Sequence, residues 1–257
     1  MAADGGTKAV VAALLANSGI AVLKFLAYLL THSSSMLAES IHSVADSSNQ
    51  ALLLLGSKRA KREATPQHPF GFGRERYFWS FVVALVLFSL GGVFALYEGI
   101  EKLRHPHEIG SAAWAVGVLG FGIVLEGYSF RTAIVESNRV RGDRSWTQFI
   151  RHSRSPELPV VLLEDAGAML GLVLALVGVG LASLTGNPAW DAVGTISIGV
   201  LLVIIAIVLA VEMKSLLIGE SATKEDRAAV VRAIEESPDI QRLIHLRTQH
   251  IGPRGAE

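Results

Sequence analysis

The sequence lacks several features on which many enzymes depend. It contains no cysteine, which excludes disulfides, a catalytic thiol and a thiolate metal site and leaves imidazole, carboxylate and carbonyl groups as metal ligands. It also contains no HExxH motif, which a zinc-dependent protease would use. The 23 basic and 23 acidic residues balance, so the net charge gives no sign of a nucleic-acid partner. We therefore expect no enzyme, no bound cofactor and no nucleic-acid binding.

Charged residues make up only 18% of the chain, whereas 51% is hydrophobic. The apolar residues are gathered in blocks, which indicates a protein that crosses a membrane several times. Six blocks are long enough to cross a bilayer as helices, at about residues 9–30, 36–56, 78–100, 112–135, 160–184 and 189–211. The predicted fold class is an all-α membrane protein, built as a six-transmembrane-helix bundle.

Basic residues are concentrated in two of the connecting segments. Residues 57–76 and 139–154 are rich in Lys and Arg, whereas the connections at 31–34 and 185–188 contain none. By the positive-inside rule, both basic segments and both termini are cytoplasmic. Residues 1–7 are too short and too weakly charged for a targeting peptide. We therefore predict a multi-pass integral membrane protein of a bacterial inner membrane.

The second apolar block carries a polar face. Glu39, His42, Asp46 and Asn49 are spaced three or four residues apart, so they lie along one face of a helix. A charged side chain in the middle of a membrane helix costs about 3 kcal/mol on insertion scales. This polar face is therefore a candidate functional site.

Acidic residues also occur in two later blocks. Glu126 lies well inside the fourth block, where an acid needs a partner or a proton. It either serves a transport pathway or forms a structural pair, for which Lys24 in the first block is a candidate partner. Glu164 and Asp165 are adjacent in the fifth block, so their side chains point about 100° apart on a helix.

His42 and Asp46 have the chemistry of half a divalent-metal site, which Asp165 from another helix could extend. A tetrahedral site of nitrogen and oxygen ligands suits Zn²⁺. Because His must be neutral and Asp ionised to bind metal, metal loading expels protons and proton binding expels metal. Two other interpretations stay open from the residues alone. One is a structural polar cluster between helices, and the other is a proton-coupled carrier of an organic solute, although the paired Gly/Pro interruptions of such carriers are missing.

The character of the sequence changes after Gly219. Residues 223–226 resemble a capping box, and an amphipathic helix follows and ends before Pro238. Residues 240–251 have the composition of a strand. One helix and one strand cannot bury a core by themselves, so we expect an incomplete α+β unit. His245 and His250 in this segment are expected to be solvated rather than metal-bound.

Several motifs together resemble the cation diffusion facilitator family of zinc transporters. They are SSSMLAESIHSVADSSNQ in the second block, HPFGFGRERYFWS before the third, and Asp191 at the start of the sixth. The LLEDAGAMLG segment and the TGNP turn are similar to the zinc transporter 9 branch of this family. The resemblance implies two units: a six-helix transmembrane transport domain at residues 1–219 and the incomplete start of a cytoplasmic ferredoxin-like domain at 220–257. It also implies a homodimer that exchanges Zn²⁺, as transported substrate, for H⁺ by alternating access.

The family's transport site joins two (H/D)xxxD pairs, one on the second helix and one on the fifth. Here His42 and Asp46 match the first pair, and Asp165 matches the second Asp. The remaining position is Val161, so one expected ligand is missing. Glu164, Glu39 and Glu126 are the candidates to complete the metal site, with Glu164 ranked first. The missing ligand also leaves open a non-transporting scaffold or regulatory protein derived from a transporter.

The loop before the third block also departs from the family pattern. It has Phe72 where the family often has a second histidine. We therefore expect His68 to pack within the loop rather than to bind metal.

Overall fold

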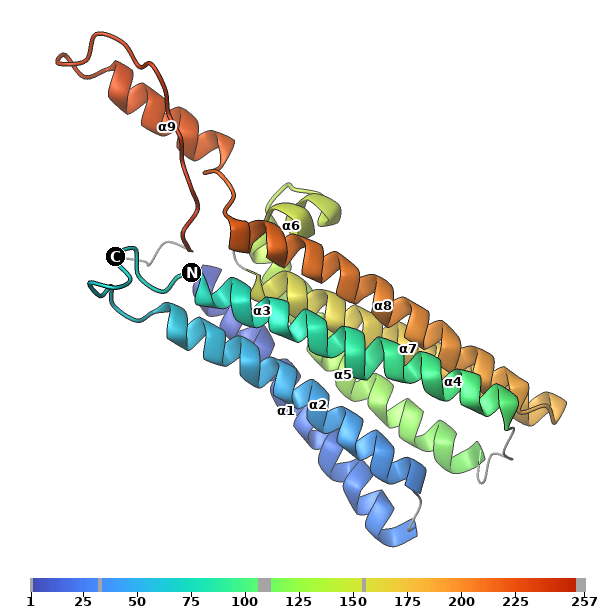
Figure 1. The fold of residues 1–257 in the computed structure, drawn as a ribbon. Helices are drawn as coiled ribbons and strands as arrows, with labels where there is room; N and C mark the ends of the chain where they lie inside the picture. The colour runs from blue at the N-terminus through green and yellow to red at the C-terminus, as the bar shows by residue number, and fades with distance from the viewer. Residues whose placement is uncertain (1, 32–33, 106–111, 154–155, 253–257) are drawn as a thin grey trace.

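The computed structural model describes residues 2–31, 34–105, 112–153 and 156–252, most of them in helices. In chain order the helices are α1 (Ala2–Thr31), α2 (Ser34–Ala60), α3 (Glu75–Val86), the π-helix η1 (Leu87–Val93), α4 (Phe94–Arg104), α5 (Ala112–Arg141), α6 (Trp146–His152), α7 (Glu157–Thr185), α8 (Ala189–Ile218) and α9 (Lys224–Glu235). The long helices lie side by side as a bundle, and α9 lies outside it (Figure 1).

Each of the six predicted apolar blocks lies in a helical segment. Among the described residues, four segments are long and apolar enough to cross a membrane: Glu75–Arg104, Ala115–Arg141, Glu157–Thr185 and Ala189–Ile218. The described apolar part of α1 is shorter, at Ala9–Leu23. The mostly helical bundle therefore agrees with the predicted membrane domain, whereas a total of six spans stays a prediction.

The third helical segment contains a π-helix, which its sequence pattern does not predict. Its middle is the π-helix η1, which joins α3 to α4. Gly92 in η1 contacts α8 so closely that an added Cβ would lie 2.6 Å from Val203 Cγ2 and 3.0 Å from Val203 N. Glycine at this position lets η1 and α8 pack backbone against backbone.

The ends of the helices follow local chemistry. Pro156 is the N-cap of α7, and Gly186 follows its last turn in the left-handed conformation, with φ of 67°. Ser145 and Gln148 form a capping box at the start of α6, and the Thr223 hydroxyl accepts from Asp226 N–H at the start of α9. Local signals therefore fix these helix boundaries.

The two basic segments lie at the same end of the bundle. The α2–α3 connection, the end of α5 and α6 are found there, together with the start of α1 and the end of α8 (Figure 1). We call this the basic end, and the opposite end, where α7 leads into α8, the far end. Lys102 and Arg104 are the exceptions at the far end. This arrangement matches the predicted grouping of the basic loops on one side.

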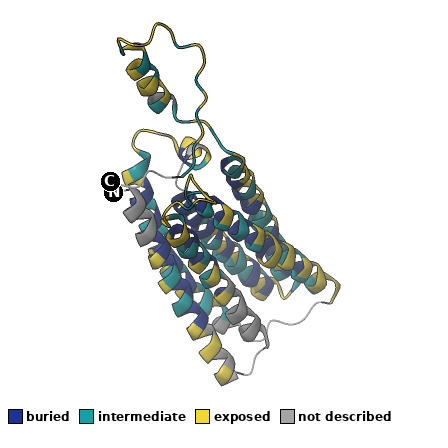
Figure 2. Ribbon diagram, turned by 60° about the vertical axis from the view of Figure 1, so that its left-hand side comes forward, coloured by how far each residue is buried: buried dark blue, intermediate teal, exposed yellow. Residues whose placement is uncertain are grey.

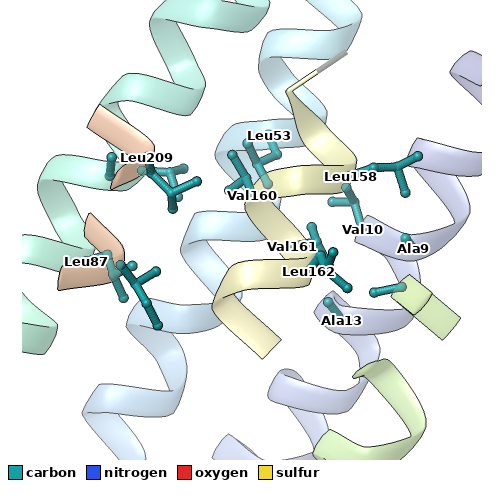
Figure 3. Close-up of a cluster of buried hydrophobic side chains, with 14 of the residues drawn as sticks. Ala9, Val10, Ala13, Leu53, Leu87, Leu158, Val160, Val161, Leu162 and Leu209 are labelled. Atoms are coloured by element: carbon teal, nitrogen blue, oxygen red, sulfur yellow. The ribbon is translucent and has the colours of Figure 1, made fainter. Parts of the chain in front are cut away.

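The bundle buries its core near the basic end. Ala9, Val10, Leu53, Leu158 and Leu209 from four helices meet there and are almost fully buried (Figure 3). The outward faces of the bundle are largely exposed (Figure 2), and large apolar side chains such as Leu15 and Val124 are found on them. Apolar outer faces suit contact with lipid chains.

The predicted strand at residues 240–251 is wrong. Those residues form no strand, and the described chain contains only an isolated bridge between Thr65 and His68. A single strand has no neighbour to satisfy its backbone groups, so the segment bonds to the chain after α8 instead. His250 N donates to Glu220 O at 2.7 Å, and Ala222 N donates to Thr248 Oγ1 at 3.1 Å. The division into two domains stays a prediction.

Candidate functional site

A cavity of about 210 Å³ lies between the helices and is lined by four acidic residues. These are Asp46 of α2, Glu126 of α5, and Glu164 and Asp165 of α7. Gly167 and Gly171 of α7 also line it, and an added Cβ at Gly167 would lie 2.7 Å from Ile205 Cδ1, so glycine there lets α8 pack close to α7. The sequence placed these acids on three separate helices, and the fold brings them to one space.

Glu164 is held by two consecutive amides of α2. Asn49 Nδ2 donates to Glu164 Oε1 at 2.9 Å, and Gln50 Nε2 donates to Glu164 Oε2 at 3.0 Å. All three residues are buried. Asn17 Nδ2 of α1 donates in turn to Gln50 Oε1 at 3.4 Å. The carboxylate ranked first for the missing ligand position thus already accepts two amide hydrogen bonds.

Asp165 has a different environment. Ser129 Oγ of α5 donates to Asp165 Oδ2 at 2.8 Å, and both residues are 1% exposed. No other hydrogen bond to Asp165 occurs among the described residues. Its second oxygen, Oδ1, is therefore available to a cation in the cavity.

Asp46 and Glu126 complete the acidic lining. Asp46 is half-buried and lies close enough to Glu164 and Asp165 to interact electrostatically with both. Glu126 is 7% exposed and interacts with Glu164 in the same way. Several carboxylates in a cavity of low dielectric need cations or protons to balance their charge.

The other predicted site residues lie outside the described side chains. His42 and Glu39 are on α2, but their side chains are not among those the structure describes, and neither is that of Lys24. Within the described part of the chain, no three His, Asp or Glu side chains are placed to hold one metal ion together. The described side chains alone therefore do not form a complete metal site, and the predicted ligand His42 is about one helical turn from Asp46.

Val161, the departure from the family pattern, is explained by its packing. It is 0% exposed and belongs to the hydrophobic core, as do its neighbours Val160 and Leu162 (Figure 3). None of the three lines the cavity. This turn of α7 therefore packs in the hydrophobic core and contributes no ligand to the cavity.

The cavity is asymmetric along the bundle. Its lining continues from the acidic residues toward the far end, along Val118 of α5, Ala175 of α7 and Ile198 of α8. On the side toward the basic end, the core around Val161 and Leu158 fills the space. The four acidic residues therefore lie beside the packed core, and the cavity extends from them toward the far end.

A buried ion pair reinforces the closed side. Arg76 Nε of α3 lies 3.0 Å from Glu157 Oε1 at the start of α7, and the two side chains are 4% and 8% exposed. Arg76 Nη2 also donates to Ser57 Oγ of α2 at 3.1 Å. Three helices are thus joined at the basic end by one guanidinium group.

The sequence predictions outside the cavity can also be compared with the structure. His68 packs in its loop, with its ring 4.6 Å from that of Phe72, as predicted. Asp191 lies in the first turn of α8, at the start of the sixth predicted block, and pairs with Lys102 at 3.2 Å. The contacts of Ser129 and Arg76 were not predicted from the sequence. Ser129 was detectable, because it is three residues after Glu126 on the same face of α5.

Comparisons with known proteins bear on this site and on the chain around it. The family model of the cation efflux transmembrane domain matches residues 10–218. The proton-coupled zinc antiporter SLC30A9, mitochondrial, of Xenopus laevis is 37% identical over 251 residues, which is 96% of this chain and 45% of that protein. The human protein of the same name is 34% identical, over 96% of this chain and 44% of its own length. Metal tolerance protein C4 of Arabidopsis thaliana is 31% identical, over 96% and 54% respectively.

The chain spans about half the length of these relatives. The match nevertheless covers nearly all of the chain, including every helix that lines the cavity. The chain belongs to the cation diffusion facilitator family, in its zinc transporter 9-like branch.

Proposed function

We propose that this protein transports divalent metal cations across a membrane, with Zn²⁺ as substrate and H⁺ as the exchanged ion. The observation that carries the proposal is the cavity in which Asp46 of α2 and Asp165 of α7 meet. Several matched relatives are named as proton-coupled zinc antiporters, which supports both the metal and the proton. The matched relatives whose names state an activity are antiporters, which supports a transporter rather than an enzyme.

We assign His42, Asp46 and Asp165 as the metal ligands. Asp165 would bind through Oδ1, because Ser129 occupies Oδ2. Glu39, Glu126 or water would fill the fourth position. Glu126 also suits a proton pathway, because it is buried beside the cavity.

Exchange follows from competition at these ligands. A metal ion displaces protons from the carboxylates and imidazole, and protons displace the metal. The described structure would be the state of an alternating-access cycle that opens toward the far end. The return state would require the core at the basic end to separate, together with the Arg76–Glu157 pair.

The remaining features of the proposal concern the assembly. We propose six membrane spans, a transport domain at residues 1–219, a cytoplasmic unit beginning at 220, and a homodimer. The grouping of basic residues supports a cytoplasmic basic end. The bacterial inner membrane stays our predicted location, although the matched animal relatives are named mitochondrial.

Vesicle transport tests the function. Purified protein in lipid vesicles with an imposed pH gradient is expected to move zinc, and the movement should stop when a protonophore removes the gradient. Manganese assayed in parallel reports metal selectivity. Absence of zinc and manganese flux in sealed vesicles would support the scaffold interpretation instead.

The Ser129–Asp165 hydrogen bond is expected to tune metal binding. Replacing Ser129 by alanine removes a partner that orients the carboxylate, so the KM for zinc should rise roughly 10-fold, at the lower end of what outer-shell partners contribute. Ser137→Ala is the matched control, because Ser137 is also buried on α5 and its hydroxyl bonds to no group in the described structure. Equal KM values for the two variants would remove Ser129 from the site.

A further inference from the structure

The two neighbouring carboxylates of α7 are engaged differently. Both oxygens of Glu164 accept amide hydrogen bonds, at 2.9 and 3.0 Å, from Asn49 and Gln50. These three residues are 7%, 2% and 0% exposed, so water hardly competes for the contacts. Asp165 accepts one hydrogen bond in the described structure and keeps Oδ1 available. Only one of the two acids is therefore arranged like a ligand.

We propose that Glu164 is a positioning residue and does not ligate the metal. Bound to Asn49 and Gln50, it holds α2 against α7 so that Asp46 and Asp165 face the same cavity. This inference rests on the proposed transport function and deepens it. It also replaces the ranking of Glu164 as the fourth ligand.

The position of this contact in the chain supports the role. Asn49 follows Asp46 by three residues on α2, which is close to one helical turn, and Glu164 directly precedes Asp165 on α7. The contact therefore joins the two helices immediately beside both proposed ligands. Both hydrogen bonds are made to one carboxyl group among buried residues, where water does not compete, so they fix this geometry well.

The contact extends to a third helix. Gln50 donates to Glu164 with its nitrogen and accepts from Asn17 with its oxygen, at 3.4 Å. Each end of the Gln50 amide thus has a partner, which fixes its orientation. Helix α1 is held to the same point as α2 and α7.

Exchanging the two partners tests the proposal. Glu164→Gln alone leaves an amide facing the Gln50 amide, and Gln50→Glu alone leaves two carboxylates facing each other. Together, the two substitutions restore a carboxylate opposite an amide, with donor and acceptor reversed, and still leave an acceptor for Asn17. Each single variant should lose zinc flux roughly 10–100-fold, as outer-shell changes do, and the exchanged protein should recover most of it.

The ligand alternative makes a different prediction. If Glu164 binds metal, the exchanged protein stays as inactive as Glu164→Gln, with a raised KM for zinc, because the carboxylate is missing from α7. Glu101→Gln is the matched control. Glu101 is 48% exposed, pairs with His105 at 3.5 Å near the far end, and should give wild-type flux when replaced.

A second measurement covers the case in which the exchanged protein does not fold. Zinc affinity of the detergent-solubilised protein is measured for Asn49→Ala, Glu164→Ala and both together. If the contact only positions the helices, the double variant should bind zinc as tightly as the weaker-binding of the two single variants, because both substitutions remove the same contact. Additive losses overturn the proposal. A wild-type protein that moves no zinc would instead overturn the proposed function.

Discussion

Zinc flux is expected to disappear when Asp46 is replaced by alanine, and equally when Asp165 is replaced by asparagine. Both side chains line the cavity. Each substitution therefore removes one anionic ligand from the proposed metal site. Loss of an outer-shell partner alone costs 10–100-fold in metal affinity or activity, so loss of a ligand should lower flux at least about 100-fold. Uptake of zinc by vesicles under an imposed pH gradient measures the effect.

The control for these variants is Asp143→Asn. Asp143 is exposed in the connection between α5 and α6, away from the cavity lining, so its replacement should leave flux unchanged. His42→Ala is expected to behave like Asp46→Ala. Gradient-dependent zinc flux in both the Asp46 and the Asp165 variants would contradict the assignment of the cavity.

The second large effect concerns folding. Replacing Glu157 by glutamine leaves the Arg76 guanidinium, 4% exposed, without its anionic partner at 3.0 Å. Removing one partner of a buried pair costs about 3–5 kcal/mol, because the remaining charge is uncompensated. The free energy of unfolding, measured by chemical denaturation in detergent, should fall by that amount.

Two further variants make this stability prediction specific. Glu98→Gln breaks a pair with Lys102, whose side chain is 36% exposed, and should cost less than about 1 kcal/mol. Replacing Arg76 by methionine and Glu157 by leucine together should be less harmful than either single loss, since an apolar pair carries no buried charge. An unchanged free energy of unfolding for Glu157→Gln would show that the pair does not hold the basic end closed.

The sequence was sufficient to locate the helices and most of the acidic lining. Apolar runs of about 20 residues specify helices in a membrane, because no other open backbone satisfies its hydrogen bonds there. Spacing alone placed Asp46 on a polar face, ligand chemistry made Asp165 a candidate partner, and the family pattern matched both. Asp46, Asp165, Glu126 and Glu164 do line one cavity in the structure.

Other features depended on contacts between helices, which spacing does not encode. Glu164 is bound by amides 114 and 115 residues away in the chain, so its role could not be read from α7 alone. Val161 stands at a position where the family pattern has a ligand, and in the structure it is a core residue. The strand expected at residues 240–251 failed because strand composition has no effect without a neighbouring strand.

Proton movement driven by zinc tests the central claim most directly. Vesicles that contain the protein and an internal pH indicator, without an imposed pH gradient, receive zinc outside. The account predicts that zinc entry raises the internal pH as protons leave, and that Asp165→Asn abolishes both movements together. Zinc entry without any change in internal pH would contradict proton exchange at this cavity.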